Sequence, residues 1–264
     1  MEKQDKKYKC GIALSGGGAR GFAHVGAMRA FDEFGFKPDI ISGVSAGSVA
    51  AVLYSAGVPP EKILSMFADK KLRTITEWNF HGDSFFHLDK FGEMIKKAVA
   101  PYTRLEELPI PTYIGATDFS KGVPVEFHTG DIAEVVMASC CIPIVFKPIV
   151  IDGIPYVDGG VLRNLPAWIL RDKCEELIGV NCSPLLHHTY KESILDIALR
   201  TFMLMERSNQ AEDIAMCDLH VEMPEIANYQ VFNLKEIRQV YISGYSSTRR
   251  AIKNYINKKN KIQK

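Results

Sequence analysis

The sequence lacks a run of apolar residues long enough to cross a membrane. No stretch approaches the roughly 18 consecutive apolar residues that a transmembrane helix requires. The first ten residues, MEKQDKKYKC, are charged and lead directly into a predicted strand, without the apolar segment and small-residue cleavage site of a secretory signal peptide. We therefore expect a cytoplasmic protein.

Cysteine pairs and other metal-binding patterns are also missing. The six cysteines are scattered over 264 residues, and none forms a Cys-x-x-Cys pair or sits at zinc-ligand spacing. Neither a D-x-D-x-D-G calcium loop nor an H-E-x-x-H zinc motif occurs. The sequence thus predicts free, buried thiols in a reducing compartment, and neither a metal nor a cofactor.

An excess of one charge is absent as well. The net charge is +1, from 32 basic and 31 acidic side chains, so no nucleic-acid partner is indicated. Basic residues gather only near the C-terminus, at Arg249, Arg250, Lys253, Lys258, Lys259, Lys261 and Lys264. They would allow peripheral contact with an anionic membrane surface, or simply form the solvated face of a helix.

What is present is an alternation of predicted strands and helices. Lys9–Leu14 and Asp39–Ser42 are short apolar runs typical of buried strands, and His24–Phe34 between them has helical spacing. Asp152-Gly153 separates two apolar runs and predicts a hairpin. Further strands are expected at Pro111–Thr117, Val123–His128, Pro148–Ile151 with Pro155–Val157, Glu176–Cys182 and Asp218–Val221, and further helices at Ser45–Ala56, from Pro59, and at Asp131–Ser139, Pro166–Lys173, Tyr190–Met216 and Leu234–Lys258.

This order of elements predicts an α/β fold, in which a mainly parallel central sheet carries helices on both faces. The chain is 47% hydrophobic, which is enough for one sizeable core. No internal repeat, linker or shift in composition divides it. We therefore expect a single domain over residues 1–264.

Gly43-Val44-Ser45-Ala46-Gly47 lies between a predicted strand and a predicted helix and fits a nucleophile elbow. Such a turn exposes the serine hydroxyl, and its flanking glycines, Gly43 and Gly47, let neighbouring backbones pass. The helix N-terminus behind Ser45 favours negative charge. Taken alone, the pentapeptide could equally be an ordinary glycine-flanked turn.

Gly16-Gly17-Gly18-Ala19-Arg20-Gly21 follows the first predicted strand and allows three interpretations. It could cradle the pyrophosphate of a dinucleotide, which requires an acidic residue at the end of the second strand. The best candidate, Asp39, precedes that strand instead. The loop could also form an oxyanion hole from backbone N–H groups, or only a tight turn.

A serine nucleophile needs a base, and seven histidines are available. None lies in a local motif that would orient it. A histidine triad in the order Ser, acid, His could use Asp158 with His187, His188 or His220. Most of the histidines are otherwise expected on loops or helix surfaces.

The ordered motifs GGGARG, GVSAG and Asp158-Gly159-Gly160 resemble those of the patatin-like phospholipase family. Residues 138–148 and 158–166 also resemble the family's Ala-Ser-x-x-x-Pro-x-x-Phe-x-Pro and Asp-Gly-Gly/Ala...Asn-x-Pro stretches. The resemblance covers about Cys10 to Pro166. It implies a three-layer α/β/α fold and a hydrolase of lipid acyl esters.

The resemblance also implies roles for individual residues. Ser45 would be the nucleophile and Asp158 the base, without a histidine, and Gly16, Gly17 and Gly18 would form the oxyanion hole. The residues that support these motifs are Arg20, Gly21, Gly43, Gly47, Gly159 and Gly160. Burial would raise the pKa of Asp158 and make it a better base, and the reaction would pass through an acyl-enzyme.

Several alternatives stay open. Arg20 could bind a phosphate or carboxylate, or be purely structural. Aromatic residues of Ile75–Leu88 could form a lid or pack in the core, and Tyr190–Met216 could line an acyl channel, a homodimer face or the core. Cys140-Cys141 could line the pocket or pack in the core. The protein could instead be a catalytically silent lipid-binding module, an acyltransferase on the same dyad, or a nucleotide-binding protein.

Overall fold

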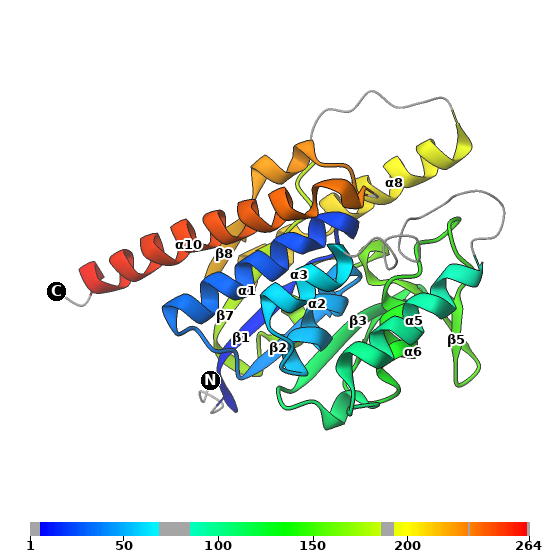
Figure 1. Ribbon diagram of the computed structural model, residues 1–264, viewed down its shortest axis with the longest axis horizontal. Coiled ribbons are helices and arrows are strands. Elements are labelled where there is room, and N and C mark those ends of the chain that lie inside the picture. The colour runs from blue at the N-terminus through cyan, green and yellow to red at the C-terminus, as the bar shows by residue number, and fades with distance from the viewer. Residues whose placement is uncertain (1–5, 69–84, 186–192, 232, 263–264) are drawn as a thin grey trace.

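The computed structural model describes residues 6–68, 85–185, 193–231 and 233–262. Within these residues, an eight-stranded sheet runs through the centre of the molecule (Figure 1) in the order β5-β6-β3-β2-β1-β7-β8, with β4 paired to β3. The strands are β1 Tyr8–Leu14, β2 Ile40–Val44, β3 Thr112–Asp118, β4 Val123–Phe127, β5 Ile149–Ile151, β6 Ile154–Asp158, β7 Cys174–Asn181 and β8 Leu219–Glu222.

Five strands of this sheet, β1, β2, β3, β7 and β8, form parallel pairs. The others, β4, β5 and β6, pair antiparallel around β3. The prediction of a mainly parallel sheet is therefore confirmed. The β5–β6 hairpin is also confirmed, and its turn places both Asp152 and Gly153 at positive φ, as a tight primed turn requires.

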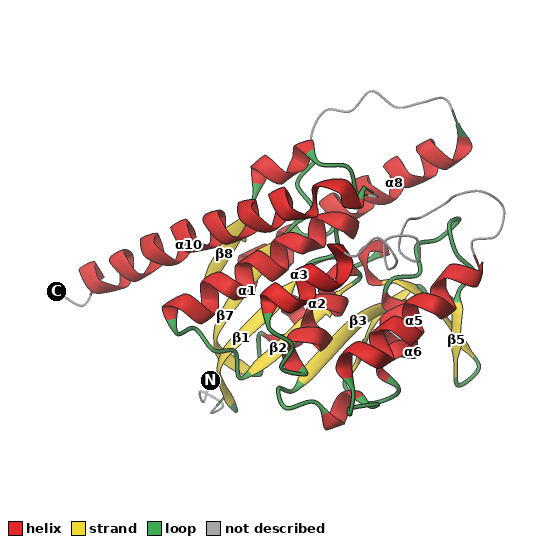
Figure 2. Ribbon diagram, in the orientation of Figure 1, coloured by secondary structure: helices red, strands yellow, loops and turns green. Residues whose placement is uncertain are grey.

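Helices cover both faces of the sheet (Figure 2). They are α1 Phe22–Phe34, α2 Ala46–Ser55, α3 Pro60–Ala68, α5 Phe85–Val99, α6 Ile132–Ser139, α7 Ala167–Leu170, α8 Ile194–Ser208, α9 Ala211–Met216 and α10 Ile237–Ile262, with short 3-10 turns η1 at Gly18–Gly21 and η3 at Gly159–Val161. The described helices include none long and apolar enough to pass through a bilayer.

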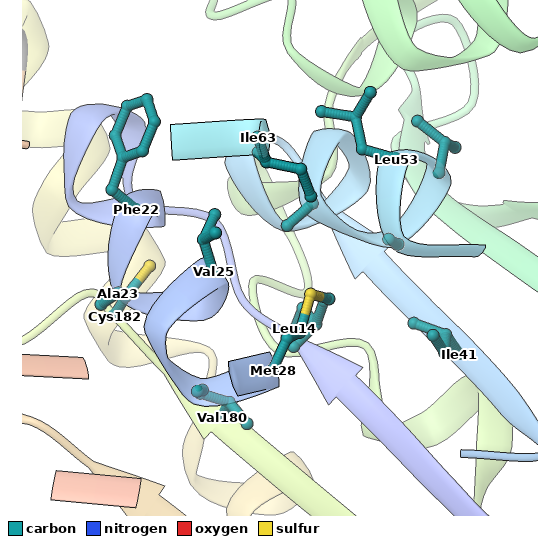
Figure 3. Packing of buried hydrophobic residues seen from close by; sticks show 14 of the residues in the cluster. Leu14, Phe22, Ala23, Val25, Met28, Ile41, Leu53, Ile63, Val180 and Cys182 are labelled. Atoms are coloured by element: carbon teal, nitrogen blue, oxygen red, sulfur yellow. The ribbon is translucent and has the colours of Figure 1, made fainter. Parts of the chain in front are cut away.

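The alternation of side chains along β1 builds the two cores. Ile12 and Leu14 join the larger cluster with Met28 of α1, whose packing Figure 3 shows. Ala13, between them, points to the other face and joins a smaller cluster with Ile169 of α7. The sheet is thus buried on both faces, which explains why its parallel strands read as continuous apolar runs.

The long helix α10 lies along α1 at very short range (Figure 1). A Cβ added at Gly26 would be 2.1 Å from the carbonyl oxygen of Tyr241, and one at Gly244 would be 2.1 Å from that of Ala23. Glycine is required at both positions because the two backbones touch there. This crossing holds α1, and with it the loop that precedes α1, against the C-terminal part of the chain.

One helix differs from the sequence-based expectations. No helix is expected at Phe85–Val99, but α5 lies there. Its interior Gly92, a poor helix former, faces Met137 of α6, where a Cβ would be 2.7 Å from the sulfur. The helical segment expected over Tyr190–Met216, for which a break was allowed, consists of α8 and α9 in its described part, with the break at Asn209-Gln210.

Candidate active site

Ser45 lies at the sharp turn from β2 into α2. Its φ of 51° and ψ of −123° are in a region that side chains rarely adopt, and the residue is 6% exposed. The backbone N–H of Ser45 donates to Ser139 Oγ at 2.8 Å, and Ser139 Oγ donates to the Gly115 carbonyl at 2.7 Å. These contacts hold the strained turn in place, as a nucleophile elbow needs.

The glycines that flank Ser45 are required by close backbone contacts. A Cβ at Gly43 would be 2.3 Å from the Gly47 carbonyl oxygen, and a Cβ at Gly47 would be 2.2 Å from that of Leu14. A larger residue at Gly43 would push the end of β2 away from the first turn of α2, and one at Gly47 would force the elbow away from β1. The geometry therefore agrees with the sequence-based interpretation of this pentapeptide as an elbow.

The glycine loop follows the carboxyl end of β1, beside the elbow. The N–H of Gly16 is already engaged, because it donates to both the carbonyl and the side-chain Oδ1 of Asn164, at 3.2 and 3.1 Å. Gly17 and Gly18 have positive φ values of 155° and 58°. No acceptor for their N–H groups is present in the described part of the chain, so these two amides remain available to a bound oxyanion.

Because Gly16 has no side chain, it also lets the glycine loop approach the elbow closely. A Cβ there would be 2.4 Å from Asn164 Oδ1 and 3.2 Å from Ser45 Cβ, so only glycine fits between the loop and the elbow. Asn164 also donates from Nδ2 to Ser183 Oγ at 3.2 Å. This buried asparagine was not assigned a role from the sequence, although it stands in the Asn-x-Pro stretch that carries the family resemblance.

Arg20 is 6% exposed and ties the glycine loop to later parts of the chain. Its Nε donates to the Tyr229 carbonyl at 2.8 Å, Nη1 to the Pro184 carbonyl at 2.9 Å and Nη2 to the Ala227 carbonyl at 2.9 Å. All three nitrogens are thus used by backbone oxygens. This arrangement favours the structural interpretation of Arg20 over a role in binding a phosphate or carboxylate.

The next loop residue, Gly21, packs directly on the helix behind the elbow. A Cβ at Gly21 would be 2.5 Å from Ala46 Cβ. The glycine loop and the first turn of α2 are therefore in van der Waals contact.

Asp158 ends β6 and is fully buried. Oδ1 accepts the Gly160 N–H at 2.8 Å, whereas Oδ2 has no partner of ordinary hydrogen-bond geometry among the described residues. Burial raises the pKa of this carboxyl to about 7, against the opposing effects of Gly160 and of the Ser45 hydroxyl. The effect of the Ser45 hydroxyl on this pKa indicates that the two side chains lie in the same buried region.

The glycines of the Asp158 motif allow the turn that follows β6 to pack closely against β3. A Cβ at Gly159 would be 2.8 Å from the Gly115 carbonyl oxygen, and one at Gly160 would be 3.1 Å from Asp158 Oδ1. Asp158 pairs with Ala116 of β3 in the sheet. The hairpin therefore brings a carboxyl next to a serine that precedes it by more than a hundred residues.

The described histidines do not supply a base. His24 is fully buried in α1, unlike the loop and helix-surface positions expected for most of the histidines. Its Nε2 lies 2.8 Å from the Ser15 carbonyl oxygen, and burial lowers its pKa to about 4, so it stays neutral. His128 stacks on Tyr113, and His220 lies on β8. The side chains of His81, His87, His187 and His188 lie outside the described residues.

Asp39 does not support a dinucleotide site. Its Oδ2 accepts hydrogen bonds from the N–H groups of Lys9 and Cys10, at 3.1 and 2.8 Å. It therefore holds the beginning of β1, at the opposite end of the strands from the glycine loop. The second strand leads into Ser45 and provides no acidic residue for a ribose.

All six cysteines are free, as the sequence predicts. The two consecutive cysteines have different surroundings. Cys141 is fully buried and donates to the Lys147 carbonyl at 2.8 Å, which is core packing. Cys140 lies beside the elbow, with its sulfur 3.8 Å from Ser48 Oγ.

An apolar cluster lies next to the Asp158 motif. It joins the segment after α6 to α8 and consists of Ile142, Val145, Phe202, Phe146, Val161 and Leu199. Phe202 Cζ is 3.1 Å from the position that a Cβ of Gly160 would occupy. Part of Tyr190–Met216, for which an acyl channel, a homodimer face and core packing were all open, thus packs beside the candidate site. The proposed aromatic lid at Ile75–Leu88 falls almost wholly outside the described residues.

Comparisons with known proteins agree with this geometry. The model of the patatin-like phospholipase family matches residues 12–171. An uncharacterized NTE family protein of Mycobacterium tuberculosis is 32% identical over 157 residues, which are 59% of this chain and 43% of that protein. Lysophospholipase NTE1 of Mycosarcoma maydis is 31% identical over 170 residues, 61% of this chain and 9% of that protein. The chain thus matches less than half of the length of these curated relatives.

Among solved structures, VipD from Legionella pneumophila has a similar fold, with a TM-score of 0.54 and 16% sequence identity. The alignment covers 94% of this chain and 67% of that one. Almost all of the chain therefore follows an architecture already seen in another protein.

Proposed function

Because the chain belongs to the patatin-like phospholipase family, we propose that it hydrolyses acyl esters of lipids with Ser45 as the nucleophile and Asp158 as the base. The observation that carries the proposal is the position of a fully buried carboxyl, with one unpartnered oxygen, against the hydroxyl of a strained elbow serine. A carboxyl whose pKa is about 7 is matched to proton transfer near neutral pH.

The proposed cycle has two halves. Asp158 accepts the proton of Ser45 Oγ as this oxygen bonds to the ester carbonyl carbon, and the carbonyl oxygen becomes an oxyanion. The tetrahedral intermediate collapses, the alcohol leaves with the proton from Asp158, and an acyl-enzyme remains. Water then attacks the acyl group while Asp158 accepts its proton, and the fatty acid leaves as Ser45 Oγ recovers that proton.

The oxyanion would be bound by the N–H groups of Gly17 and Gly18, at the N-terminal end of η1. One such donor is worth roughly 2.7–4 kcal/mol of barrier in enzymes of this kind. Gly16 contributes differently from the initial expectation, since its N–H is bonded to Asn164. Its role in this proposal is to let the loop approach Ser45. The N-terminus of α2 adds a favourable dipole.

The substrate class follows from the relatives and from the apolar cluster beside Asp158. One relative is named a lysophospholipase. The partly buried members of this cluster, Phe146, Val161 and Leu199, would offer an apolar surface to a fatty acyl chain. We therefore propose lysophospholipids and related lipid esters as substrates. An acyltransferase would use the same acyl-enzyme, and analysis of products in the presence of a lysolipid or alcohol acceptor distinguishes the two.

The test is hydrolysis of p-nitrophenyl acyl esters and of lysophosphatidylcholine by the wild type, Ser45→Ala and Asp158→Ala. We expect both variants to lose at least 10³-fold in kcat, on the order seen when serine hydrolase residues are removed. Ser208→Ala, an exposed serine that donates to the Met205 carbonyl, is the matched control and should keep full activity. A fluorophosphonate probe should label Ser45. A folded Ser45→Ala protein with wild-type activity would refute the proposal.

A catalytically silent lipid-binding module is the competing function. It predicts that the purified wild-type protein binds lysophosphatidylcholine but neither hydrolyses it nor reacts with the fluorophosphonate. The strained backbone of Ser45 and the free amides of the glycine loop argue against a binding module, because lipid binding without catalysis requires neither feature.

A further inference from the structure

A second buried carboxyl lies at the candidate site. Glu206, on α8, is 5% exposed, although glutamate is almost never buried without a partner. Its Oε1 is 3.0 Å from the position that a Cβ of Gly16 would occupy, and Ser45 Cβ is 3.2 Å from that same position. Glu206 therefore touches the glycine loop on the side that faces the Ser45 side chain.

No hydrogen bond or ion pair to Glu206 is found among the described residues. The groups that face it are Asp158 at the end of β6, Arg20 in η1 and the thiol of Cys182 after β7. Arg20 acts on Glu206 only through its charge, without a direct ion pair among the described residues, and its three nitrogens are held by backbone carbonyls. The nearest acidic neighbour, Asp158, repels a negative charge on Glu206.

These surroundings determine the protonation state of Glu206. A carboxylate removed from water without a paired cation is strongly disfavoured. Burial raises the pKa of Glu206 well above its usual value, Asp158 raises it further, and Arg20 opposes the shift. Burial without a paired cation therefore favours the neutral, protonated form of Glu206.

We propose that Glu206 is a further catalytic residue that, as a neutral carboxylic acid, donates a hydrogen bond to the oxygen of the ester bound at Ser45. The proposal rests on the hydrolytic function proposed above. The proton stays on Glu206 throughout, so no bond forms or breaks there. The hydrogen bond strengthens as negative charge develops on the ester oxygen, and Glu206 then supplements the amides of Gly17 and Gly18. Its lack of a protein partner leaves its hydroxyl free for the substrate.

A pair of substitutions separates the hydrogen bond from the charge. Glu206→Gln keeps the size and a hydrogen-bond donor but cannot ionise, whereas Glu206→Leu keeps similar volume without a donor. We expect kcat/KM for a p-nitrophenyl acyl ester to stay within about threefold of wild type in Glu206→Gln and to fall about 10²-fold in Glu206→Leu, mainly through kcat. Glu222→Gln, at a half-exposed glutamate next to Arg207, is the control and should change neither.

The pH profile provides a second readout. Wild-type activity should decline at alkaline pH, where Glu206 ionises, loses its donor proton and adds a second negative charge beside Asp158. Glu206→Gln should lack this decline, and a purely structural role of Glu206 would not remove it. The proposal is overturned if folded Glu206→Leu retains wild-type kcat/KM, or if folded Glu206→Gln loses as much activity as Glu206→Leu.

The proton itself can be observed by infrared spectroscopy with carbon-13-labelled glutamate. At the pH of about 7 at which Asp158 titrates, we expect a band of a protonated glutamic acid in the wild type and in Asp158→Asn, and none in Glu206→Gln. Absence of the band from the wild type overturns the proposal. This outcome is distinct from a failure of the proposed function, which would appear as unchanged ester hydrolysis by Ser45→Ala.

Discussion

The Ser139 hydroxyl oxygen accepts a hydrogen bond from the backbone N–H of Ser45 at 2.8 Å, and the Ser139 hydroxyl donates to the Gly115 carbonyl at 2.7 Å. Both serines are buried. This short chain of hydrogen bonds links the elbow to β3 through the end of α6. It explains how the backbone of Ser45 can be held in a conformation that is unfavourable for any residue other than glycine.

Ser139→Ala should consequently destabilise the elbow. The substitution leaves the buried N–H of Ser45 without an acceptor, at a cost of about 1–3 kcal/mol in the free energy of unfolding. We also expect a lower kcat for ester hydrolysis, because the Ser45 hydroxyl is no longer held against Asp158. Urea unfolding and steady-state kinetics measure the two effects. Thr201→Ala, at an exposed hydroxyl on α8, should change neither, and equal stabilities of Ser139→Ala and wild type would contradict the inference.

The pH dependence of hydrolysis should follow Asp158. The base must be ionised to accept the proton of Ser45, and burial raises the pKa of Asp158 to about 7. We therefore expect kcat/KM to rise as the pH increases through about 7, well above the range in which an exposed aspartate titrates. The assay is p-nitrophenyl ester hydrolysis with circular dichroism at each pH as a check on folding. A profile that is flat between pH 5 and pH 8 would exclude Asp158 as the titrating base.

Asp158→Asn should stabilise the folded protein while it abolishes activity. The carboxyl has a raised pKa in the folded state, so its ionisation costs stability at high pH. The cost is full above about pH 7, shrinks as the pH falls below 7 and vanishes near pH 4. A shift of this size corresponds to about 4 kcal/mol at most.

Urea unfolding at pH 8 and pH 5 tests this prediction. The gain from Asp158→Asn should be largest at pH 8 and clearly smaller at pH 5. Asp152→Asn, in the exposed hairpin turn, provides a carboxyl-to-amide control without burial. A loss of stability in Asp158→Asn at pH 8 would mean that the ionised carboxyl is well solvated in the folded protein.

Gly18→Ala should lose more stability and activity than the unfavourable positive φ of Gly18 alone would cause. Gly18 has a φ of 58°, and a Cβ there would be 2.5 Å from the Val231 carbonyl oxygen. Gly35 has a φ of 71° with nothing within 4 Å of its Cβ position. Gly35→Ala should therefore lose only about 1–2 kcal/mol of stability and keep its activity. Gly18→Ala should lose more stability and at least tenfold in kcat, and similar values for the two variants would refute the steric argument.

Much of this architecture is predictable from the sequence, because its signals are local. Buried parallel strands produce apolar runs, and glycine marks each passage from strand to helix. The strand and helix around Ser45 were thus predicted to within about two residues. The position of Asp158 beside Ser45 is different in kind, since only the resemblance to a known family implied it.

The remaining features depend on contacts between residues far apart in the chain. Ser45 and its acceptor Ser139 are separated by 94 residues, and Gly16 and Asn164 by 148. No local pattern reveals that Asn164 takes up the amide of Gly16, or that His24 and Glu206 are buried on amphipathic helices. Such polar side chains look like surface residues until the tertiary packing that surrounds them is known.

The carbonyls that hold the glycine loop come from a late part of the chain. Val231 accepts the N–H of Ala19 at 2.7 Å, and Ala227 and Tyr229 accept from Arg20. A ribosome makes β1, the elbow and the Asp158 hairpin before these residues and before α10. A nascent chain therefore already contains Ser45 and Asp158 while the glycine loop still lacks these anchors. Competence for hydrolysis is expected to arise late in synthesis, when α10 closes on α1.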